Sequence, residues 1–430
     1  MRRWRTDGGL SFGWMAALAL FGAIAATSPN WARAEPPPPV TSEFSRAKLD
    51  RVGDYFRNEV ATGKIPGAVV LIQQHGRPAY FESFGRRDVA TGQPMTADSI
   101  FRLYSMSKPV TSVAPMLLVD DGRLKLDDRL SKYIPAFADV KVAVAKPVED
   151  GKQALVTEPL ARAITIEDLL RHTSGITYGF YGDVPVRKLY ANSDLFDGDF
   201  DNAQFVERLA RLPLAEQPET LWDYGHSVDV LGHVVEVVSG KSLFQFEKER
   251  LLDPLGMTDT AFDVADAARR GRVAQFLPDD CFTRRIAGIV DPVLPRRWES
   301  GGAGMVGTIG DYARFAQMLL NRGILDGKRY LRPETIALMT SDHIGPQTGI
   351  ARDQFDFPGG DSGFGLGFAV RTIANPPLAL DEYRWDGVGG TFFFIDPKDD
   401  MFTIVMMQSP SQRGRIETEA KRLVYEALEK

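Results

Sequence analysis

Cysteine is almost absent from this chain, and so is any pattern of metal-binding residues. The single cysteine, Cys281, excludes an intrachain disulfide, so stability must come from the packed core. The five histidines are scattered, without the spacing of a metal site. We therefore expect neither a metal ion nor a cofactor, and any catalysis would rest on side chains alone.

Positive charge is not concentrated anywhere in the sequence. With 51 basic and 57 acidic residues the net charge is −6. No basic stretch interleaved with aromatic residues occurs, which argues against a nucleic-acid partner. Hydrophobic residues make up 44% of the 430 positions. That is enough for a large core, in one large domain with a subdomain or in two domains.

The N-terminus has the order of a secretory signal peptide. A basic segment, residues 1–5, precedes an apolar run, residues 12–26, that is too short to span a bilayer comfortably. The small residues Ala32 and Ala34 then fit the rule for a cleavage site. We predict cleavage after Ala34 and a proline-rich leader over residues 35–40. The protein would be periplasmic or secreted, without a stable membrane anchor; an uncleaved anchor is the alternative.

Strand-like segments occur at both ends of the chain, and helical patterns occupy the middle. The expected strands are residues 67–74, 78–84, 365–370, 382–385, 391–396 and 402–408. The clearest expected helices are residues 41–62, 164–171, 229–239, 309–320 and 415–430. This order predicts an α/β fold of the α+β type, with one antiparallel sheet built from both chain ends and flanked by helices. The domain would span residues 41–430, with a mostly helical subdomain inserted at approximately residues 125–300.

The most informative motif is S-x-x-K at Ser105-Met106-Ser107-Lys108. Residues 99–104 before it are expected to be extended, and residues 109–121 after it carry an apolar stripe of helical spacing. Ser105 would therefore lie at a helix N-terminus, which favours developing negative charge. Lys108 lies about one turn further on, so its amine can point back at the serine hydroxyl. Because a serine hydroxyl is a weak nucleophile until a base takes its proton, this pair indicates nucleophilic catalysis.

The motif by itself is weak evidence. At ordinary composition S-x-x-K occurs by chance about once in a chain of this length, and Ser45-Arg46-Ala47-Lys48 also matches, within a charged surface helix. An N-cap serine with an exposed lysine is the structural alternative for Ser105. Whether Ser105 is a nucleophile or an N-cap therefore depends on the other motifs in the chain.

Two later segments accompany it. In Trp222-Asp223-Tyr224-Gly225-His226-Ser227 a phenol precedes an expected helix, where it can pass a proton. In Trp385-Asp386-Gly387-Val388-Gly389-Gly390, between two expected strands, glycines let the backbone approach a ligand and offer N–H groups to an oxyanion. Taken alone, the first could be a buried aromatic and the second a tight hairpin.

Together and in this order, the three segments resemble the serine hydrolases of the class C beta-lactamase and penicillin-binding-protein superfamily. That superfamily carries S-x-x-K, then Y-x-N or a variant, then K-T-G or a variant, and the resemblance extends over nearly all of the chain from residue 41. Two positions differ. His226 stands where beta-lactamases have asparagine, and Trp385 stands where they have a lysine that holds the drug's carboxylate. A W-x-G third motif is most similar to family VIII carboxylesterases.

The resemblance implies a role for each matching residue. Ser105 would be the nucleophile, with Lys108 and Tyr224 as coupled base and acid. The backbone N–H groups of Ser105 and Val388 would form the oxyanion hole. Substrate contacts would come from Trp385, Gly387, His226, Tyr178 and Tyr181. A cap on the following helix is the alternative role for His226.

The expected activity is that of an exported serine carboxylesterase acting on a small-molecule ester with a short acyl chain, with weak beta-lactamase activity as a side reaction. A tryptophan in place of the lysine offers an apolar wall to an uncharged substrate, which favours esters. The alternatives on the same scaffold are a beta-lactamase, a D,D-peptidase or D-aminopeptidase-type amide hydrolase, and a transacylase. A non-catalytic binding protein is the remaining alternative.

Overall fold

The structure is a computed structural model that describes residues 43–147, 153–180, 182, 184–195, 199–280, 296–352, 358–376 and 378–429. The predicted signal peptide and leader, Tyr181 and Cys281 lie outside these residues. No helix in the described ranges combines the length and the apolar composition needed to cross a bilayer.

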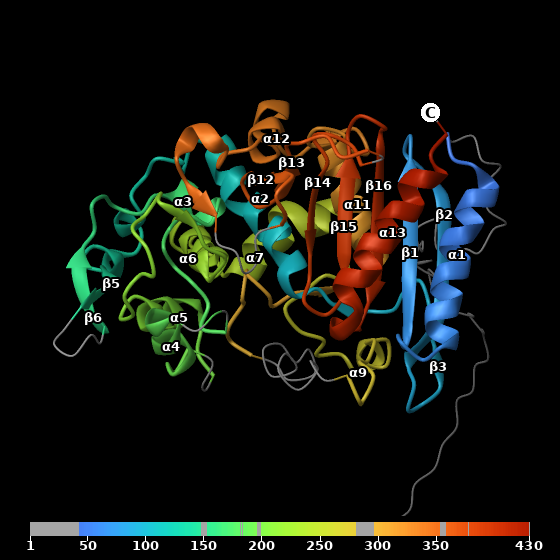
Figure 1. Cartoon of the computed structure of the whole chain (residues 1–430), viewed down its shortest axis with the longest axis horizontal. Helices are drawn as coiled ribbons and strands as arrows, with labels where there is room; N and C mark the ends of the chain where they lie inside the picture. Colours follow the sequence, from blue (N-terminus) through green and yellow to red (C-terminus); the bar gives the residue numbers. More distant parts are fainter. Residues whose placement is uncertain are drawn as a thin grey trace, which may run out of the picture. The chain divides into compact units, whose positions relative to one another are not determined.

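An eight-stranded antiparallel sheet is the centre of the fold (Figure 1). Its order is β12-β13-β14-β15-β16-β1-β2-β3. The strands are β1 (Gly67–Gln74), β2 (Arg77–Asp88), β3 (Gln93–Pro94), β12 (Ser362–Phe364), β13 (Ala369–Arg371), β14 (Tyr383–Asp386), β15 (Phe392–Asp396) and β16 (Met401–Met407). The two ends of the chain join where β1 pairs with β16, from Ala68 opposite Met407 to Gln74 opposite Met401. The predicted fold class, an antiparallel sheet assembled from both chain ends, is confirmed.

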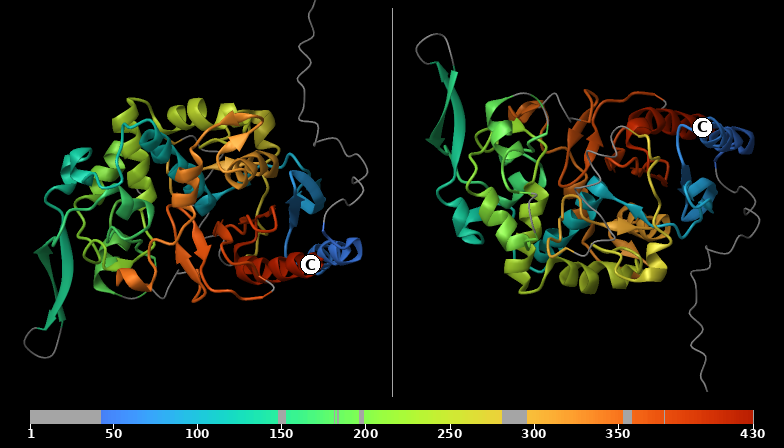
Figure 2. Two further views of the ribbon diagram at one scale, coloured as in Figure 1. Left: turned by 90° about the horizontal axis from the view of Figure 1, so that it is seen from above. Right: turned by 90° about the horizontal axis from the view of Figure 1, so that it is seen from below.

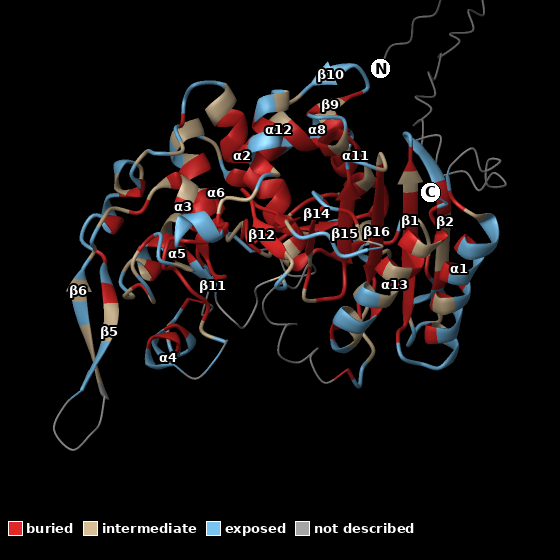
Figure 3. Ribbon diagram, turned by 45° about the horizontal axis from the view of Figure 1, so that its top comes forward, coloured by how far each residue is buried: buried red, intermediate tan, exposed pale blue. Residues whose placement is uncertain are grey.

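Helices cover both faces of this sheet. The helices α1 (Arg46–Ala61) and α13 (Arg413–Ala427) pack together on one face, and α11 (Ile309–Leu320) packs on the other. Strand β1 shows the alternation directly: Ala68, Val70 and Ile72 join the core beneath α1 and α13, while Val69 and Leu71 join the core on the opposite face. Because both faces are covered, β1 and β16 are predominantly apolar and almost entirely buried (Figure 3).

The remaining helices lie mostly on the α11 side of the sheet. They are α2 (Ser107–Asp120), α3 (Ile166–Leu170), α4 (Pro185–Ala191), α5 (Asn202–Leu209), α6 (Ser227–Ser239), α7 (Leu243–Glu247), α8 (Asp253–Leu255), α9 (Ala267–Arg270) and α12 (Pro333–Met339). Short helical turns are η2 (Tyr104–Met106), η3 (Leu130–Lys132), η4 (Pro135–Phe137), η6 (Lys248–Leu252), η7 (Pro346–Thr348) and η8 (Pro410–Gln412). Helix α2 packs against α6 and is buried on nearly all sides. It therefore holds the S-x-x-K segment rigidly between the sheet and the other helices.

Several predicted boundaries are wrong. The first helix begins at Arg46. Of the strand expected at residues 365–370, only residues 369–370 are extended, in β13, and residues 365–368 form the turn between β12 and β13. The turn closes with a hydrogen bond from Gly365 N to Phe368 O, 2.8 Å, and needs Gly367 at φ +100°. The extended segment expected before Ser105 pairs at β4 (Phe101–Arg102) and through an isolated bridge between Ile100 and Val273.

A β-hairpin interrupts the region expected to be helical. Strands β5 (Lys141–Pro147) and β6 (Gln153–Pro159) pair antiparallel and project from the helical part, as both views in Figure 2 show. Their short apolar runs, residues 142–145 and 154–156, separated by a polar stretch that contains Gly151, were the signal that sequence reasoning missed. The remaining short strands are β7 (Leu221–Trp222), β8 (Val306–Gly307), β9 (Ile324–Leu325), β10 (Lys328–Arg329) and β11 (Ala351–Arg352).

Candidate active site

Ser105 lies in the helical turn η2 that leads directly into α2. Strand β4 pairs with β8 and delivers the chain to this turn, where Tyr104 adopts a left-handed conformation, φ +48°. Lys108, in the first turn of α2, is only 1% exposed, and its Nζ lies 3.3 Å from Ser105 Oγ. The structure thus brings together the serine and lysine that the motif spacing paired, and the exposed lysine of the alternative interpretation is excluded.

The Lys108 amine has several partners besides the serine. It donates to Tyr178 Oη at 3.1 Å and to the Gly302 carbonyl oxygen at 2.7 Å. It also lies 4.4 Å from the centroid of the Tyr224 ring, within the range of a cation–π contact. The amine is therefore held at a defined position between Ser105 and the two tyrosines.

Tyr224 is held in place by a hydrogen-bond donor that sequence reasoning did not foresee. The indole Nε1 of Trp385, at the end of β14, donates to Tyr224 Oη at 3.3 Å, and the two ring centroids are 5.3 Å apart. Trp385 is 6% exposed, so the indole is both a buried aromatic wall and a hydrogen-bond donor. Trp385, for which the sequence predicted only an apolar wall, therefore also orients the Tyr224 phenol.

A buried imidazole supports Tyr224 from another side. The His172 ring lies 4.8 Å from the Tyr224 ring, and neither of its nitrogens has a hydrogen-bond partner in the described part of the chain. Burial, reinforced by the positive charge of Lys108, holds the pKa of His172 well below its usual value of 6.5. His172 is therefore a neutral packing group next to the lysine at physiological pH.

The glycines of the third motif bring its loop against the Ser105 turn. A Cβ at Gly387 would lie 2.2 Å from the Leu103 carbonyl oxygen, and one at Gly389 would lie 2.8 Å from the Tyr104 ring. Between them Val388 packs against Tyr104, and its backbone N–H makes no backbone hydrogen bond within the described residues. Only glycines allow this approach, which leaves the Val388 N–H beside the nucleophile turn.

Asp229, on α6, holds several groups of the site in place through hydrogen bonds. Sequence reasoning did not identify it. Its carboxylate accepts from Ser300 Oγ at 2.6 Å and from Gly302 N at 3.0 Å, and it contacts His226 Nδ1 at 3.0 Å. Burial alone would raise the pKa of Asp229, but the hydrogen bond and charge of His226 and the charge of Lys108 lower it below its usual value. Asp229 thus anchors Gly302, whose carbonyl oxygen accepts from Lys108.

The remaining predicted substrate contacts are His226, Tyr178 and Tyr181. His226 occupies the N-cap position of α6, but its side chain caps no backbone N–H, so the capping alternative is wrong. Its imidazole is 2% exposed and meets the Tyr178 ring edge-on at 4.4 Å. Tyr178 faces the Lys108 amine, whereas Tyr181 lies outside the described residues.

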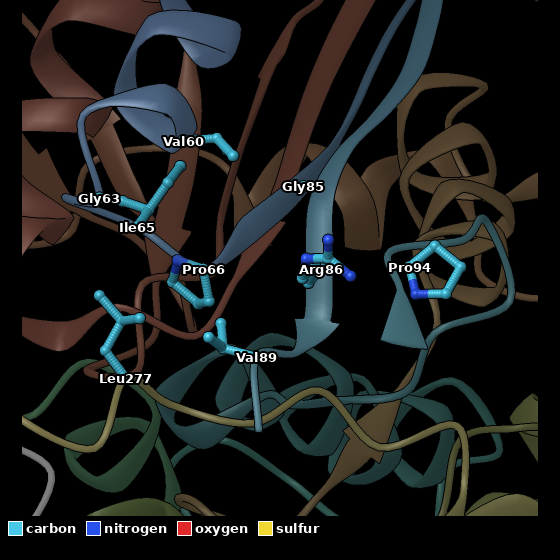
Figure 4. A pocket seen from close by; sticks show the side chains of 9 residues that line it. All are labelled: Val60, Gly63, Ile65, Pro66, Gly85, Arg86, Val89, Pro94 and Leu277. Carbon is cyan, nitrogen blue, oxygen red and sulfur yellow. The ribbon is translucent and has the colours of Figure 1, made fainter. Parts of the chain in front are cut away.

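No group of three or more histidine, cysteine, aspartate or glutamate side chains within the described ranges could hold a metal ion. A cavity of about 480 Å³ lies elsewhere, at the end of α1 and beside β2 (Figure 4), and none of the site residues lines it.

The fold and this cluster define the class of protein. The Beta-lactamase family model matches residues 52–426, and the chain belongs to this family, within the serine hydrolases of the beta-lactamase and penicillin-binding-protein superfamily. The resemblance noted from the three motifs is therefore confirmed.

Individual relatives include esterases. The chain is 34% identical over 302 residues to lovastatin esterase of Penicillium rubens, covering 68% of this chain and 72% of that protein. It is 29% identical over 387 residues to esterase EstB of Burkholderia gladioli, covering 81% and 87%. Among solved structures it is similar to EstCE1, described as a hydrolase with promiscuous acyltransferase activity, with a TM-score of 0.72, 27% identity and coverage of 88% and 99%.

Proposed function

We propose that this protein is a serine carboxylesterase that cleaves short-chain carboxylic esters through an acyl-enzyme on Ser105. The observation that carries the proposal is the contact of Trp385 with Tyr224. In the beta-lactamases that the motifs resemble, the third motif offers a lysine cation at this place. Here a neutral indole N–H points at the phenol, which suits an uncharged ester better than an anionic drug.

In the first half of the reaction, Ser105 Oγ attacks the ester carbonyl carbon. Its proton passes to the pair formed by Lys108 and Tyr224, since the lysine amine is 3.3 Å from the hydroxyl. The backbone N–H groups of Ser105 and Val388 receive the oxyanion. The tetrahedral intermediate then collapses, the carbon–oxygen bond to the alcohol breaks, and the alcohol leaves with the proton held by the pair.

In the second half, water attacks the carbonyl carbon of the acyl-enzyme and gives a proton to Tyr224 as base. The carbon–oxygen bond to Ser105 then breaks, Ser105 Oγ takes a proton back from the Lys108–Tyr224 pair, and the carboxylic acid is released. The surroundings of Tyr224 suit this role because the Trp385 N–H stabilises negative charge that develops on the phenol oxygen. Trp385 and Gly387 shape the substrate edge, and Tyr178 and His226 support the lysine and its anchor rather than the substrate.

Two relatives that are named esterases support ester substrates over beta-lactams. The test is a paired assay on the full chain, comparing kcat/KM on p-nitrophenyl butyrate with that on nitrocefin and using Ser105→Ala as the blank. A large ester preference that disappears in Ser105→Ala is the expected result. A preference for nitrocefin would move the assignment to beta-lactam hydrolysis, and ester turnover unchanged in Ser105→Ala would refute the serine mechanism.

Acyl transfer is the second candidate, because the similar protein EstCE1 is described as having a promiscuous acyltransferase activity. The acyl-enzyme would then pass its acyl group to an alcohol instead of water. Adding a primary alcohol to the same assay and measuring the new ester by chromatography separates the two. If the new ester forms in larger amount than the free carboxylic acid although water is in excess, acyl transfer is the main activity.

We further propose that the protein is exported and cleaved after Ala34, on the pattern of its first 34 residues. N-terminal sequencing of the protein from periplasm and medium tests this, with Glu35 as the expected first residue. An intact N-terminus in the membrane fraction would instead identify an uncleaved anchor.

A further inference from the structure

The cavity shown in Figure 4 is a separate feature from the candidate active site. It lies where α1 ends, beside the second half of β2, and has a volume of about 480 Å³. This volume is within the range of small-molecule sites. Its lining comes from three segments that are distant in sequence: the end of α1 with residues 63–66, the end of β2 with Pro94, and Leu277.

The lining is predominantly aliphatic. Val60, Ile65, Pro66, Val89 and Leu277 supply apolar walls, and Val89 is 46% exposed although it is a large hydrophobic residue. Gly85 allows β2 to pass close to the segment before β1, because a Cβ there would lie 2.4 Å from the Pro66 carbonyl oxygen and 3.0 Å from Val60 Cγ1. The cavity therefore offers apolar surface that remains in contact with water until a ligand covers it.

One charged group, Arg86, stands in this apolar lining. Its backbone is held opposite Pro94 in the β2–β3 pair, and its guanidinium donates to the Gly92 carbonyl oxygen. It makes no ion pair with an acidic side chain in the part of the chain that the structure describes, and no acidic residue lines the cavity. A guanidinium carries five N–H donors in a planar fork, so donors remain for a carboxylate.

We propose that this cavity binds a small aliphatic monocarboxylate, with Arg86 pairing with the carboxylate and the aliphatic lining covering the chain. An apolar tail alone would bring no negative charge to Arg86, and an anion without a tail would leave the aliphatic walls exposed to water. The amphiphilic acid satisfies both.

The cavity is distinct from the catalytic cluster, but two consecutive residues connect them. Phe276 lies 5.0 Å from the Arg102 guanidinium and packs against Tyr104, which precedes Ser105. The next residue, Leu277, lines the cavity instead. Neither Ser105 nor Lys108 lines the cavity, so an acid bound there would not contact them.

Calorimetric titration of octanoate into the full chain tests the proposal. The expected result is saturable binding that Arg86→Gln weakens at least about tenfold, since a charge-assisted hydrogen bond is lost. Val89→Glu should weaken it similarly by placing a second carboxylate beside the ligand. Both substitutions are at exposed positions, so ester hydrolysis without octanoate and the melting temperature should stay unchanged.

Arg77→Gln is the matched control, because it removes the same charge from the start of β2, about 30 Å along the strand from Arg86. It should leave octanoate binding unchanged. Octanol, which lacks the charge, should bind more weakly than octanoate and should not respond to Arg86→Gln. Octanoate binding that is absent, that is equal in the wild type and Arg86→Gln, or that is matched by octanol would overturn the assignment.

Discussion

Replacing Trp385 by phenylalanine isolates the contact on which the proposed function rests. The indole is 6% exposed, donates from Nε1 to Tyr224 Oη at 3.3 Å, and packs at 5.3 Å from the rings of Tyr224 and Phe364. Phenylalanine keeps an aromatic ring against both neighbours, removes the donor and fills less space than the indole. Trp385→Phe therefore separates the hydrogen bond from the apolar wall.

The magnitude follows from the geometry. A neutral hydrogen bond of ordinary length contributes about 0.5–1.5 kcal/mol net. Because about 1.4 kcal/mol corresponds to a factor of ten in rate, the ester kcat of Trp385→Phe should fall by about twofold to tenfold. The KM should change little, since the N–H contacts the proposed acid–base residue rather than the substrate. Trp385→Ala should additionally lower stability by about 3–5 kcal/mol through the lost packing.

Steady-state hydrolysis of p-nitrophenyl butyrate, with thermal unfolding of each variant, measures both effects. Trp298→Phe is the control for loss of an indole elsewhere, because Trp298 stacks on Phe205 at 4.4 Å, away from Tyr224. A wild-type kcat in Trp385→Phe would show that the indole N–H has no part in the reaction. A raised KM with unchanged kcat would assign Trp385 to substrate binding alone.

Three other substitutions test the surroundings of Lys108 and the buried carboxyl group of Glu247. Tyr178→Phe removes an acceptor of the Lys108 amine and should lower the ester kcat about tenfold; an unchanged kcat contradicts the role. Asp229→Asn weakens the hydrogen bond that holds Gly302 in place. It should lower the ester kcat at least about tenfold and should also lower the melting temperature. A lower melting temperature with an unchanged kcat would limit Asp229 to a structural role. Burial raises the pKa of Glu247 well above 4.5, so the folded state keeps a proton that the unfolded chain releases. Stability should fall as pH rises from about 4.5 to the folded-state pKa, and Glu247→Gln should remove this loss. Urea unfolding of both proteins at pH 4.5 and pH 8 measures it, and a difference independent of pH would contradict the assignment.

Sequence reasoning located the elements whose patterns are long and apolar. Residues 67–74 and 309–320 coincide with β1 and α11, because a buried strand and an amphipathic helix each leave a periodic pattern. It failed at the β5–β6 hairpin, which projects from the helical part, and at residues 365–368, where glycines form a turn instead of a strand. Local patterns of apolar residues indicate which face of an element is buried. They do not indicate where a hairpin projects from the fold or where glycines make the chain turn.

The chain alone determined that Ser105 and Lys108 would meet, because three residues of helical backbone set their separation. It also determined the order of the three motifs and hence the family. Only the tertiary structure decided which groups surround them. Asp229 reaches Gly302 across 73 residues, and Trp385 reaches Tyr224 across 161 residues. Contacts of such separation depend on how helices and sheet pack together, and no periodicity along the chain encodes the direction in which a single N–H points.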